Sequence, residues 1–301
     1  MSLTTHTVAP GAAGTRLDVY LADATAFSRS YIAKLAKSGA ITVNDKVAKS
    51  SQITEPEDII KIDAPEHTSI KGTASVPDLP IVYEDDDLIV VNKPAGIPAH
   101  GGAGQGSGPT VAAFAQTHST DPDPERPGII HRLDKDTSGL MMIAKSAEAK
   151  ATMQAAFKAH AVHKTYLALV IGRLEPETAV IKLPLARDPA QPLRQAVVAS
   201  GREAITKYHV EATYPGYSLV CAEPATGRTH QLRVHFAAVG HPIAGDTQYG
   251  LPKAPTGLSR QFLHATKLEF TAPSGARVQL ECPLPDDLNS FLTQLGSEVA
   301  A

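Results

Sequence analysis

The chain has 301 residues, of which 43% are hydrophobic and 20% are charged, and its formal net charge is −3. This is globular composition, and the length suits a small domain joined to a larger one. No apolar run reaches the roughly 18 residues of a membrane-spanning helix, and the first residues lack the basic and apolar regions of a secretory signal. The two cysteines form no Cys-x-x-Cys pair, so we expect a cytoplasmic protein with reduced cysteines in its core.

The first 64 residues indicate a flexible tail followed by a small folded module. Residues 1–13 are small and polar, which predicts the tail. Beyond them, Ser28 can serve as the N-cap of a helix that Gly39 ends. The spacing of apolar residues predicts two helices and then two strands, at about residues 17–24, 28–37, 41–43 and 58–62. We therefore expect one compact domain over residues 14–64.

A linker and a larger domain are expected to follow. Residues 65–80 hold three prolines and few large apolar side chains, which predicts the linker. Residues 100–127 are dominated by glycine, proline and polar residues, so they are predicted to be irregular. The remaining pattern predicts helices at 149–157 and 229–240, and strands at 81–83, 88–91, 140–144, 165–171, 204–223 (a pair), 268–270 and 278–280.

Basic residues gather in two stretches of this weakly acidic chain, residues 29–49 and residues 131–210. In the first stretch, Arg29, Lys34 and Lys37 lie on or beside one predicted helix. Such clusters are compatible with a polyanionic partner, and equally with ordinary solvated faces.

Several kinds of site are not indicated. The glycine-rich residues 101–108 fit neither phosphate-binding glycine motif. His230, His235 and His241 lack the spacing of a zinc site, and no Gly-x-Ser-x-Gly elbow occurs. We therefore expect no metal and no cofactor.

The densest concentration of charged and titratable residues runs from His131 to Asp136, just ahead of a predicted buried strand. Cations near Asp134 would favour its ionised form. An ionised and oriented carboxylate is suited to act as a nucleophile or base rather than as a general acid. A charged surface turn would give the same pattern.

A second concentration lies in residues 227–235. If Thr229 caps the helix that starts there, Arg228 lies just outside a positively polarised helix end. A positive charge at that position is destabilised by the helix dipole, so we expect Arg228 to have an anionic partner. The start of an ordinary amphipathic helix is the alternative interpretation.

Taken together, these segments resemble pseudouridine synthases of the RluA type that carry an S4-like N-terminal domain. His131–Gly139 matches the signature H-R-L-D-x-x-T-S-G at every fixed position. Residues 83–96 and 227–246 resemble the first and the C-terminal motif of the family. Residues 16–62 resemble an S4 RNA-binding domain through Arg16-Leu17-Asp18, Ser28-Arg29-Ser30, Gly39 and Val43-Asn44.

The resemblance implies an α+β fold, with a small S4-like domain and a catalytic domain, residues 81–301, built on a mixed, mostly antiparallel sheet. It implies that the protein isomerises uridine to pseudouridine in RNA. Asp134 would be the essential aspartate, Tyr166 would pack on the target uracil, and Arg228 would pair with Asp134. Arg132 would help to displace the target base or hold phosphate, with His131 beside it at the RNA.

The resemblance also implies partners. Arg29, Lys34 and Lys37 would bind phosphates, and the S4-like domain favours large-subunit ribosomal RNA, or its assembly precursor, over transfer RNA. A non-catalytic RNA-binding protein fits less well because the aspartate, arginine and tyrosine are all present, and a hydrolase using His131 would need a nucleophile elbow. We expect a monomer without a membrane partner. The residues leave open whether Asp134 attacks C1′, adds at C6 or removes the 2′ proton.

Overall fold

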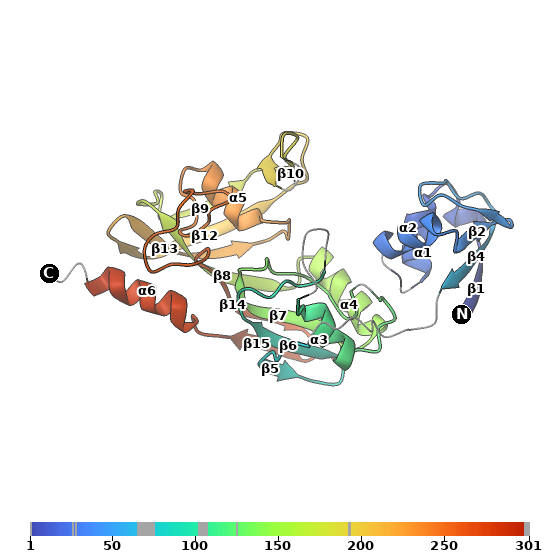
Figure 1. Ribbon diagram of the computed structural model, residues 1–301, viewed down its shortest axis with the longest axis horizontal. Helices are drawn as coiled ribbons and strands as arrows, with labels where there is room; N and C mark the ends of the chain where they lie inside the picture. The colour runs from blue at the N-terminus through green and yellow to red at the C-terminus, as the bar shows by residue number, and fades with distance from the viewer. Residues whose placement is uncertain are drawn as a thin grey trace. The chain divides into compact units, whose positions relative to one another are not determined.

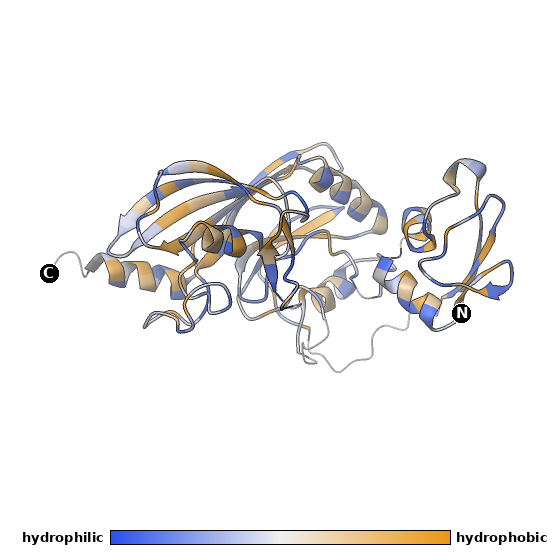
Figure 2. Ribbon diagram, turned by 90° about the horizontal axis from the view of Figure 1, so that it is seen from above, coloured by the Kyte–Doolittle hydropathy of each residue, from blue (hydrophilic) through white to orange (hydrophobic). Residues whose placement is uncertain are grey.

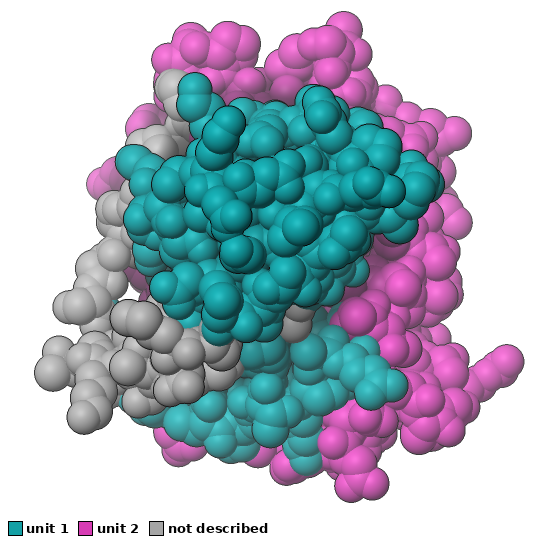
Figure 3. Space-filling view, turned by 90° about the vertical axis from the view of Figure 1, so that its right-hand side faces the viewer, with its two compact units in different colours: residues 1–77, 100–129, 144–150 teal, residues 78–99, 130–143, 151–301 magenta. Residues whose placement is uncertain are grey.

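The computed structural model describes residues 2–25, 27, 29–64, 76–101, 108–124, 126–191 and 194–297 (Figure 1). Ser28, most of the predicted linker and residues 102–107 of the glycine-rich segment lie outside the described residues. Two compact units make up the chain: residues 1–77, 100–129 and 144–150, and residues 78–99, 130–143 and 151–301 (Figure 3). In the part that is described, no helix is both long and apolar enough to cross a membrane.

The N-terminal part of the first unit is an antiparallel sheet with two helices. Among its described residues the sheet has four strands, in the order β1-β4-β2-β3. The elements are β1 (Ser2–Thr7), the 3-10 helix η1 (Pro10–Ala12), α1 (Leu17–Ala24), α2 (Arg29–Lys37), β2 (Ile41–Val43), β3 (Lys46–Val47) and β4 (Ile59–Ala64). Both predicted helices and both predicted strands of this region are confirmed.

The expectation of a flexible tail is wrong for residues 2–7, because they form β1 and pair with β4 along its whole length. The segment is rich in threonine, whose β-branched and polar side chain suits an exposed edge strand. Beneath the sheet, a core of fully buried side chains joins helices and strands: Leu17, Leu21, Ile32, Ile41, Ile60 and Ile62.

A single large sheet dominates the second unit. Nine strands of the described chain take part, in the order β5-β6-β7-β14-β8-β13-β12-β9 with β15 paired to β14. β7 and β14 are parallel, whereas the other pairings established along this sheet are antiparallel. The strands are β5 (Ile81–Glu84), β6 (Leu88–Lys93), β7 (Ser138–Ala144), β8 (His163–Ile171), β9 (Thr178–Lys182), β12 (Ile205–Tyr214), β13 (Tyr217–Pro224), β14 (Leu263–Thr271) and β15 (Arg277–Glu281). The predicted α+β class with a mixed, mostly antiparallel sheet is confirmed.

The parallel pairing of β7 with β14 depends on one glycine. Gly139 has a φ of 113°, and a Cβ there would collide with the backbone of Ala265 on β14. All seven residues of β7 are buried, so this strand is fixed in the middle of the sheet. The turn that carries Asp134 leads directly into β7 and is held in place by it.

Helices and one short hairpin complete the fold. They are α3 (Val111–His118), α4 (Ala147–Lys158), α5 (Gln231–Ala238), α6 (Asp286–Ser297), and the hairpin of β10 (Leu185–Arg187) and β11 (Gln195–Val197). Helix α3 lies in the segment that was expected to be irregular, and Thr110 caps it by accepting a hydrogen bond from Ala113 N at 3.1 Å. Helix α6 buries Leu288, Phe291, Leu292 and Leu295, and its two-sided hydropathy is visible in Figure 2.

Candidate active site

A buried lysine fixes the turn that carries Asp134. The Nζ of Lys93, at the end of β6, donates to the carbonyls of Pro94, Ile97 and Lys135 at 2.8, 3.0 and 3.0 Å. Burial lowers the pKa of Lys93 to about 7, and the charges of Asp136 and Asp134 oppose that shift. Because three carbonyls converge on one side chain, Lys135, the residue after Asp134, is tied to the segment after β6.

Arg233, on α5, is the cation that contacts Asp134. Its Nη1 lies 3.1 Å from Asp134 Oδ2, and its Nε and Nη2 bind the two oxygens of Asp246 at 2.7 and 3.0 Å. The Arg233 side chain is 8% exposed and that of Asp134 is 16% exposed. The guanidinium of Arg233 is therefore held on one side by the buried carboxylate of Asp246. On its other side it contacts the carboxylate of Asp134, which solvent can still reach.

The charge of this arginine is secured by its surroundings. Burial opposes it, but the hydrogen bond that Arg233 donates to Asp246 and the charges of Asp134 and Asp246 raise the pKa of Arg233 above its ordinary value. Gln248 Oε1 accepts from Nη2 at 3.0 Å, and the guanidinium lies 5.0 Å from the centre of the Tyr249 ring. A planar, permanently charged fork suits this arrangement better than an ammonium group would.

His230 approaches Asp134 from a strained backbone position. It precedes α5 with a φ of 56° and makes no capping hydrogen bond with its side chain. Its Nε2 lies 3.8 Å from Asp134 Oδ1, and its Nδ1 lies 2.7 Å from the Tyr249 hydroxyl. Left-handed backbone in a residue other than glycine costs about 1 kcal/mol or more and often marks a functional position.

We expect the hydrogen bonds around Tyr249 to select which nitrogen of His230 carries the proton. The Tyr249 hydroxyl accepts from the Gln195 backbone N–H at 2.9 Å, so its own proton is directed to Nδ1 of His230. Burial lowers the pKa of His230 from its ordinary value, which keeps the ring neutral. The remaining ring proton is then on Nε2 and faces the carboxylate of Asp134.

We expect nitrogen-15 NMR of the full chain near neutral pH to show His230 as the Nε2–H tautomer. In Tyr249→Phe the donor to Nδ1 is lost, so protonation of Nδ1 becomes easier and the pKa of His230 should rise. A pH titration of its ring nitrogens measures both effects, with the resonances of His118 serving as an internal control. An Nδ1–H tautomer in the unmodified chain would contradict this hydrogen-bond assignment.

Tyr166 lies on the central strand β8, on the side of the sheet that faces Asp134. Its cross-strand neighbours are Ala222 on β13 and Ala265 on β14, whose small side chains leave the ring uncrowded within the sheet. Burial and then the charge of Asp134 raise the pKa of the Tyr166 hydroxyl, which therefore stays protonated. The structure thus places Tyr166 close enough to Asp134 for that charge to act on its hydroxyl.

The pairing expected for Arg228 is wrong. Its Nε donates to the Glu203 carbonyl at 2.9 Å, and the guanidinium on Asp134 belongs to Arg233. The expected cap at Thr229 is also wrong: His230 is the N-cap residue, and the side chain of Gln231 accepts from Arg228 N at 3.0 Å. Because the helix starts two residues later than expected, Arg233 lies in its first turn.

His131 and Arg132 differ in placement. His131 Nε2 accepts from Met142 N at 2.9 Å, and its ring stacks on Phe157. The side chain therefore contacts the backbone of β7 directly. Burial, and then the charge of Lys164, lowers the pKa of His131 to about 3. The His131 ring is therefore neutral, and both Met142 N and Phe157 contact it. Arg132, in contrast, is exposed, and its charge acts on His230.

In the N-terminal sheet and helix region, Arg29, Lys34 and Lys37 are exposed on α2. Arg29 Nη2 donates to Asp18 at 2.8 Å, which links α2 to α1. The hydrogen bond from Arg16, followed by that from Arg29, holds the pKa of Asp18 at about 2 although burial opposes it. Lys34 and Lys37 are three residues apart and share one face of the helix.

Sequence reasoning passed over Lys93, Arg233, Asp246 and Tyr249. Lys93, Arg233 and Asp246 lie inside the motifs of residues 83–96 and 227–246, and Tyr249 lies three residues after the second. A buried lysine between two tight segments, and an aspartate after a glycine turn, leave no periodic signal. Their partners are set by the tertiary fold, which spacing along the chain does not reveal.

Comparison with known proteins identifies the family. Residues 15–60 match the S4 domain, and residues 87–238 match the RNA pseudouridylate synthase family. The chain belongs to this family. It is an RNA pseudouridine synthase, an isomerase, as the sequence predicted.

Relatives of the synthase resemble it over nearly its full length. An uncharacterized RNA pseudouridine synthase of Mycobacterium bovis is 38% identical and aligns over 97% of both chains. The ribosomal large subunit pseudouridine synthase D of Xanthomonas campestris is 34% identical over 99% of this chain and 94% of its own. The solved structure of human RNA pseudouridylate synthase domain containing 1 superposes with a TM-score of 0.58 and 28% identity, covering 76% of this chain and 97% of that one.

Proposed function

We propose that this synthase converts specific uridines of large-subunit ribosomal RNA, or of its assembly precursor, to pseudouridine. Two observations support the substrate. The chain carries an S4 domain, and several relatives at 34–38% identity are named ribosomal large subunit pseudouridine synthase D. Its cytoplasmic location and monomeric state remain predictions.

The single observation that carries the proposed chemistry is Asp134 held between Arg233 and His230 at the end of a rigid turn. In the reaction, the bond from uracil N1 to ribose C1′ breaks and a bond from C5 to C1′ forms. The hydrogen on C5 is released and N1 gains one, so atoms balance without a redox partner or water. An ionised Asp134 would act on the ribose or on the uracil ring during that exchange.

Tyr166 would receive the uracil that has left the RNA stack. An aromatic ring stacked on a base contributes about 1–3 kcal/mol, which offsets much of the few kcal/mol that unstacking costs. The protonated hydroxyl of Tyr166 keeps a negative charge away from the ring face. Arg132, exposed beside Asp134, would fill the vacated space or bind phosphate.

Arginines near the β10–β11 hairpin would add phosphate contacts. The Arg194 guanidinium lies 5.1 Å from the centre of the Tyr249 ring, which also packs against Arg233. The charge of Arg202 acts on Arg228, so these two lie close together. Guanidinium groups clustered in this way suit the backbone of a bound RNA.

Release of tritium from RNA labelled at uridine C5 tests the proposal, with large-subunit ribosomal RNA and bulk transfer RNA assayed in parallel. We expect release from the ribosomal RNA. Release from transfer RNA alone would overturn the substrate and keep the chemistry. Absence of release from free RNA and from isolated precursor particles would overturn the proposed substrate altogether.

The lysines of α2 are expected to bind RNA phosphates. Replacing Lys34 and Lys37 together by glutamine should weaken RNA affinity, and the slope of log affinity against log salt should fall by about 1.4–1.8 for two lost contacts. Turnover at saturating RNA should change little. The double variant Lys46→Gln, Lys61→Gln makes the same charge change on the sheet of this region, and an equal loss there would refute a specific role for α2.

A further inference from the structure

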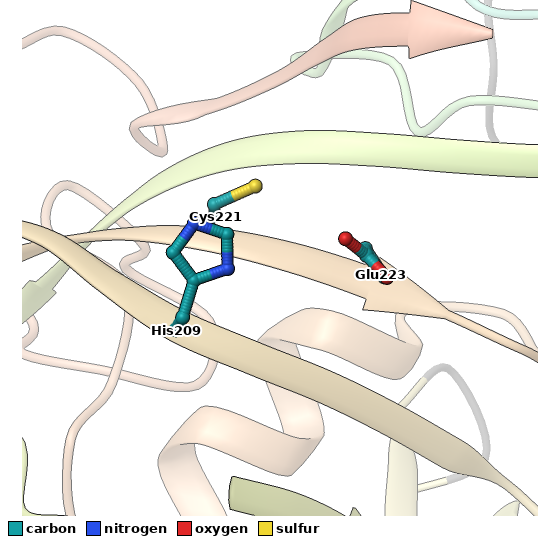
Figure 4. A group of neighbouring side chains, drawn as sticks. All are labelled: His209, Cys221 and Glu223. Carbon is teal, nitrogen blue, oxygen red and sulfur yellow. The ribbon is translucent and has the colours of Figure 1, made fainter. Parts of the chain in front are cut away.

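A second cluster of chemically reactive side chains lies on β12 and β13. His209 is the direct cross-strand partner of Cys221, and Glu223 follows two residues later on the same face of the sheet. In Figure 4 the three side chains turn toward one another, and their potential ligand atoms all lie within 4.8 Å of each other. Three different ligand types from two adjacent strands therefore converge on one point.

This cluster is separate from the active site. Successive side chains of a strand point to opposite faces of a sheet. Ala222, which lies between Cys221 and Glu223, is the cross-strand neighbour of Tyr166, so the cluster occupies the face opposite to Tyr166. The His209 side chain is 47% exposed, and solvent ions can reach it.

The ligand set is that of a borderline-soft divalent cation. Imidazole nitrogen, thiolate sulfur and carboxylate oxygen bind Zn²⁺ in a tetrahedron whose ligand atoms are about 3.5 Å apart. The separations in the cluster, all within 4.8 Å, exceed that value by at most about 1.3 Å. Rotation of side chains on an exposed sheet face can close such a gap.

A neighbouring carboxylate orients the histidine. Glu211 is the extra residue of a bulge in β12, and its Oε2 lies 3.2 Å from His209 Nε2. If Nε2 donates to Glu211, Nδ1 is the nitrogen that remains for an ion. A carboxylate hydrogen-bonded to the second nitrogen of a metal-binding histidine is a recurrent and affinity-raising arrangement.

The negative charges around Cys221 favour the binding of a cation beside its sulfur. Burial raises the pKa of the Cys221 thiol to about 11, with further contributions from Glu223 and Glu211 and an opposing one from Lys267. Lys207 lies opposite Glu223, while the strand partners Leu167 on β8 and Thr178 on β9 are uncharged. Glu223 and Glu211 bring negative charge to this face, which attracts a divalent ion.

We propose that His209, Cys221 and Glu223 form a site for a Zn²⁺-type divalent ion, with Glu211 orienting the histidine. This departs from the absence of metal that the sequence predicted, because a cross-strand triad leaves no spacing signature. Binding releases the thiol proton to solvent as the sulfur–metal bond forms.

Titration of the full chain with Co²⁺ tests the site without reference to activity. We expect one equivalent to bind with a thiolate-to-cobalt charge-transfer band, and Zn²⁺ to displace it. Cys221→Ser should abolish the band, and His209→Gln or Glu223→Gln should weaken binding at least about tenfold. Cys282→Ser and Glu281→Gln, which alter the other cysteine and a nearby exposed carboxylate, should leave binding unchanged.

Site-resolved alkylation gives an independent readout. Zn²⁺ should protect Cys221 from a maleimide in the unmodified chain, and this protection should be lost in Glu223→Gln. Two results would overturn the proposal: no saturable charge-transfer band with Co²⁺, or a band that survives Cys221→Ser. Both readouts remain valid whichever RNA the synthase modifies.

Discussion

Replacing Asp134 with asparagine is expected to abolish pseudouridine formation while RNA still binds. The amide is close in shape to the carboxylate, and its oxygen can still accept from Arg233 Nη1, which lies 3.1 Å from Oδ2 in the unmodified protein. The amide is uncharged, however, and can neither attack carbon nor take a proton. We expect a loss of at least about 10³-fold in single-turnover rate, with RNA affinity changed less than about threefold. Tritium release at saturating RNA and a filter-binding titration measure the two quantities.

Asp136→Asn provides the matched control, since this carboxylate stands two residues along the same charged turn. It lies outside the contacts of Arg233 and acts on Lys93 only through its charge. Turnover in this variant should stay within about tenfold of the unmodified enzyme. Measurable turnover by Asp134→Asn, or an equal loss in both variants, would contradict a chemical role for Asp134.

Local signals in the sequence were sufficient to predict the buried strand that follows Asp134. The residues Thr137-Ser138-Gly139 predict a turn into a buried strand, and the structure places β7 there. The positive φ of Gly139 and its close approach to Ala265 explain why a glycine stands at the start of that strand. A short motif and a continuous apolar run were therefore enough to predict this turn and the strand after it, because both signals extend over only a few residues.

The partner of Asp134 could not be predicted in the same way. The resemblance implied Arg228 as the partner, and the sequence predicted a helix capped by Thr229. The structure instead starts the helix after a left-handed His230, whose conformation is stabilised by Tyr249 and not by capping. Tyr249 lies 19 residues away in the chain. A contact of that kind is invisible to propensity and spacing.

Several elements escaped prediction because their signals are weak or misleading. Residues 2–7 are short, polar and terminal, yet backbone pairing with β4 orders them. Helix α3 begins within a glycine- and proline-rich stretch, where composition outweighed a short apolar patch. Strands β10 and β11 are three residues each and are defined only by their pairing with each other.

Exchanging Arg233 for lysine is expected to reduce turnover about 10²–10³-fold, whereas Arg228→Lys should alter mainly RNA affinity. Lysine keeps the positive charge but cannot bind both oxygens of Asp246 and also reach Asp134, so the carboxylate loses its fixed orientation. Such positional losses commonly amount to 100-fold or more. Single-turnover rates for the two variants, measured at saturating RNA, compare them directly.

Lysine is preferable to alanine at position 233 for a physical reason. Removing the guanidinium altogether would leave Asp246 as an unpaired buried charge, at a cost of about 3–5 kcal/mol, and unfolding would obscure the chemistry. Thermal unfolding of both lysine variants should therefore accompany the rates, with Arg233→Lys expected to melt somewhat lower. If Arg228→Lys slowed turnover more than Arg233→Lys at equal folded fraction, Arg228 and not Arg233 would be the arginine that orients Asp134 during the reaction.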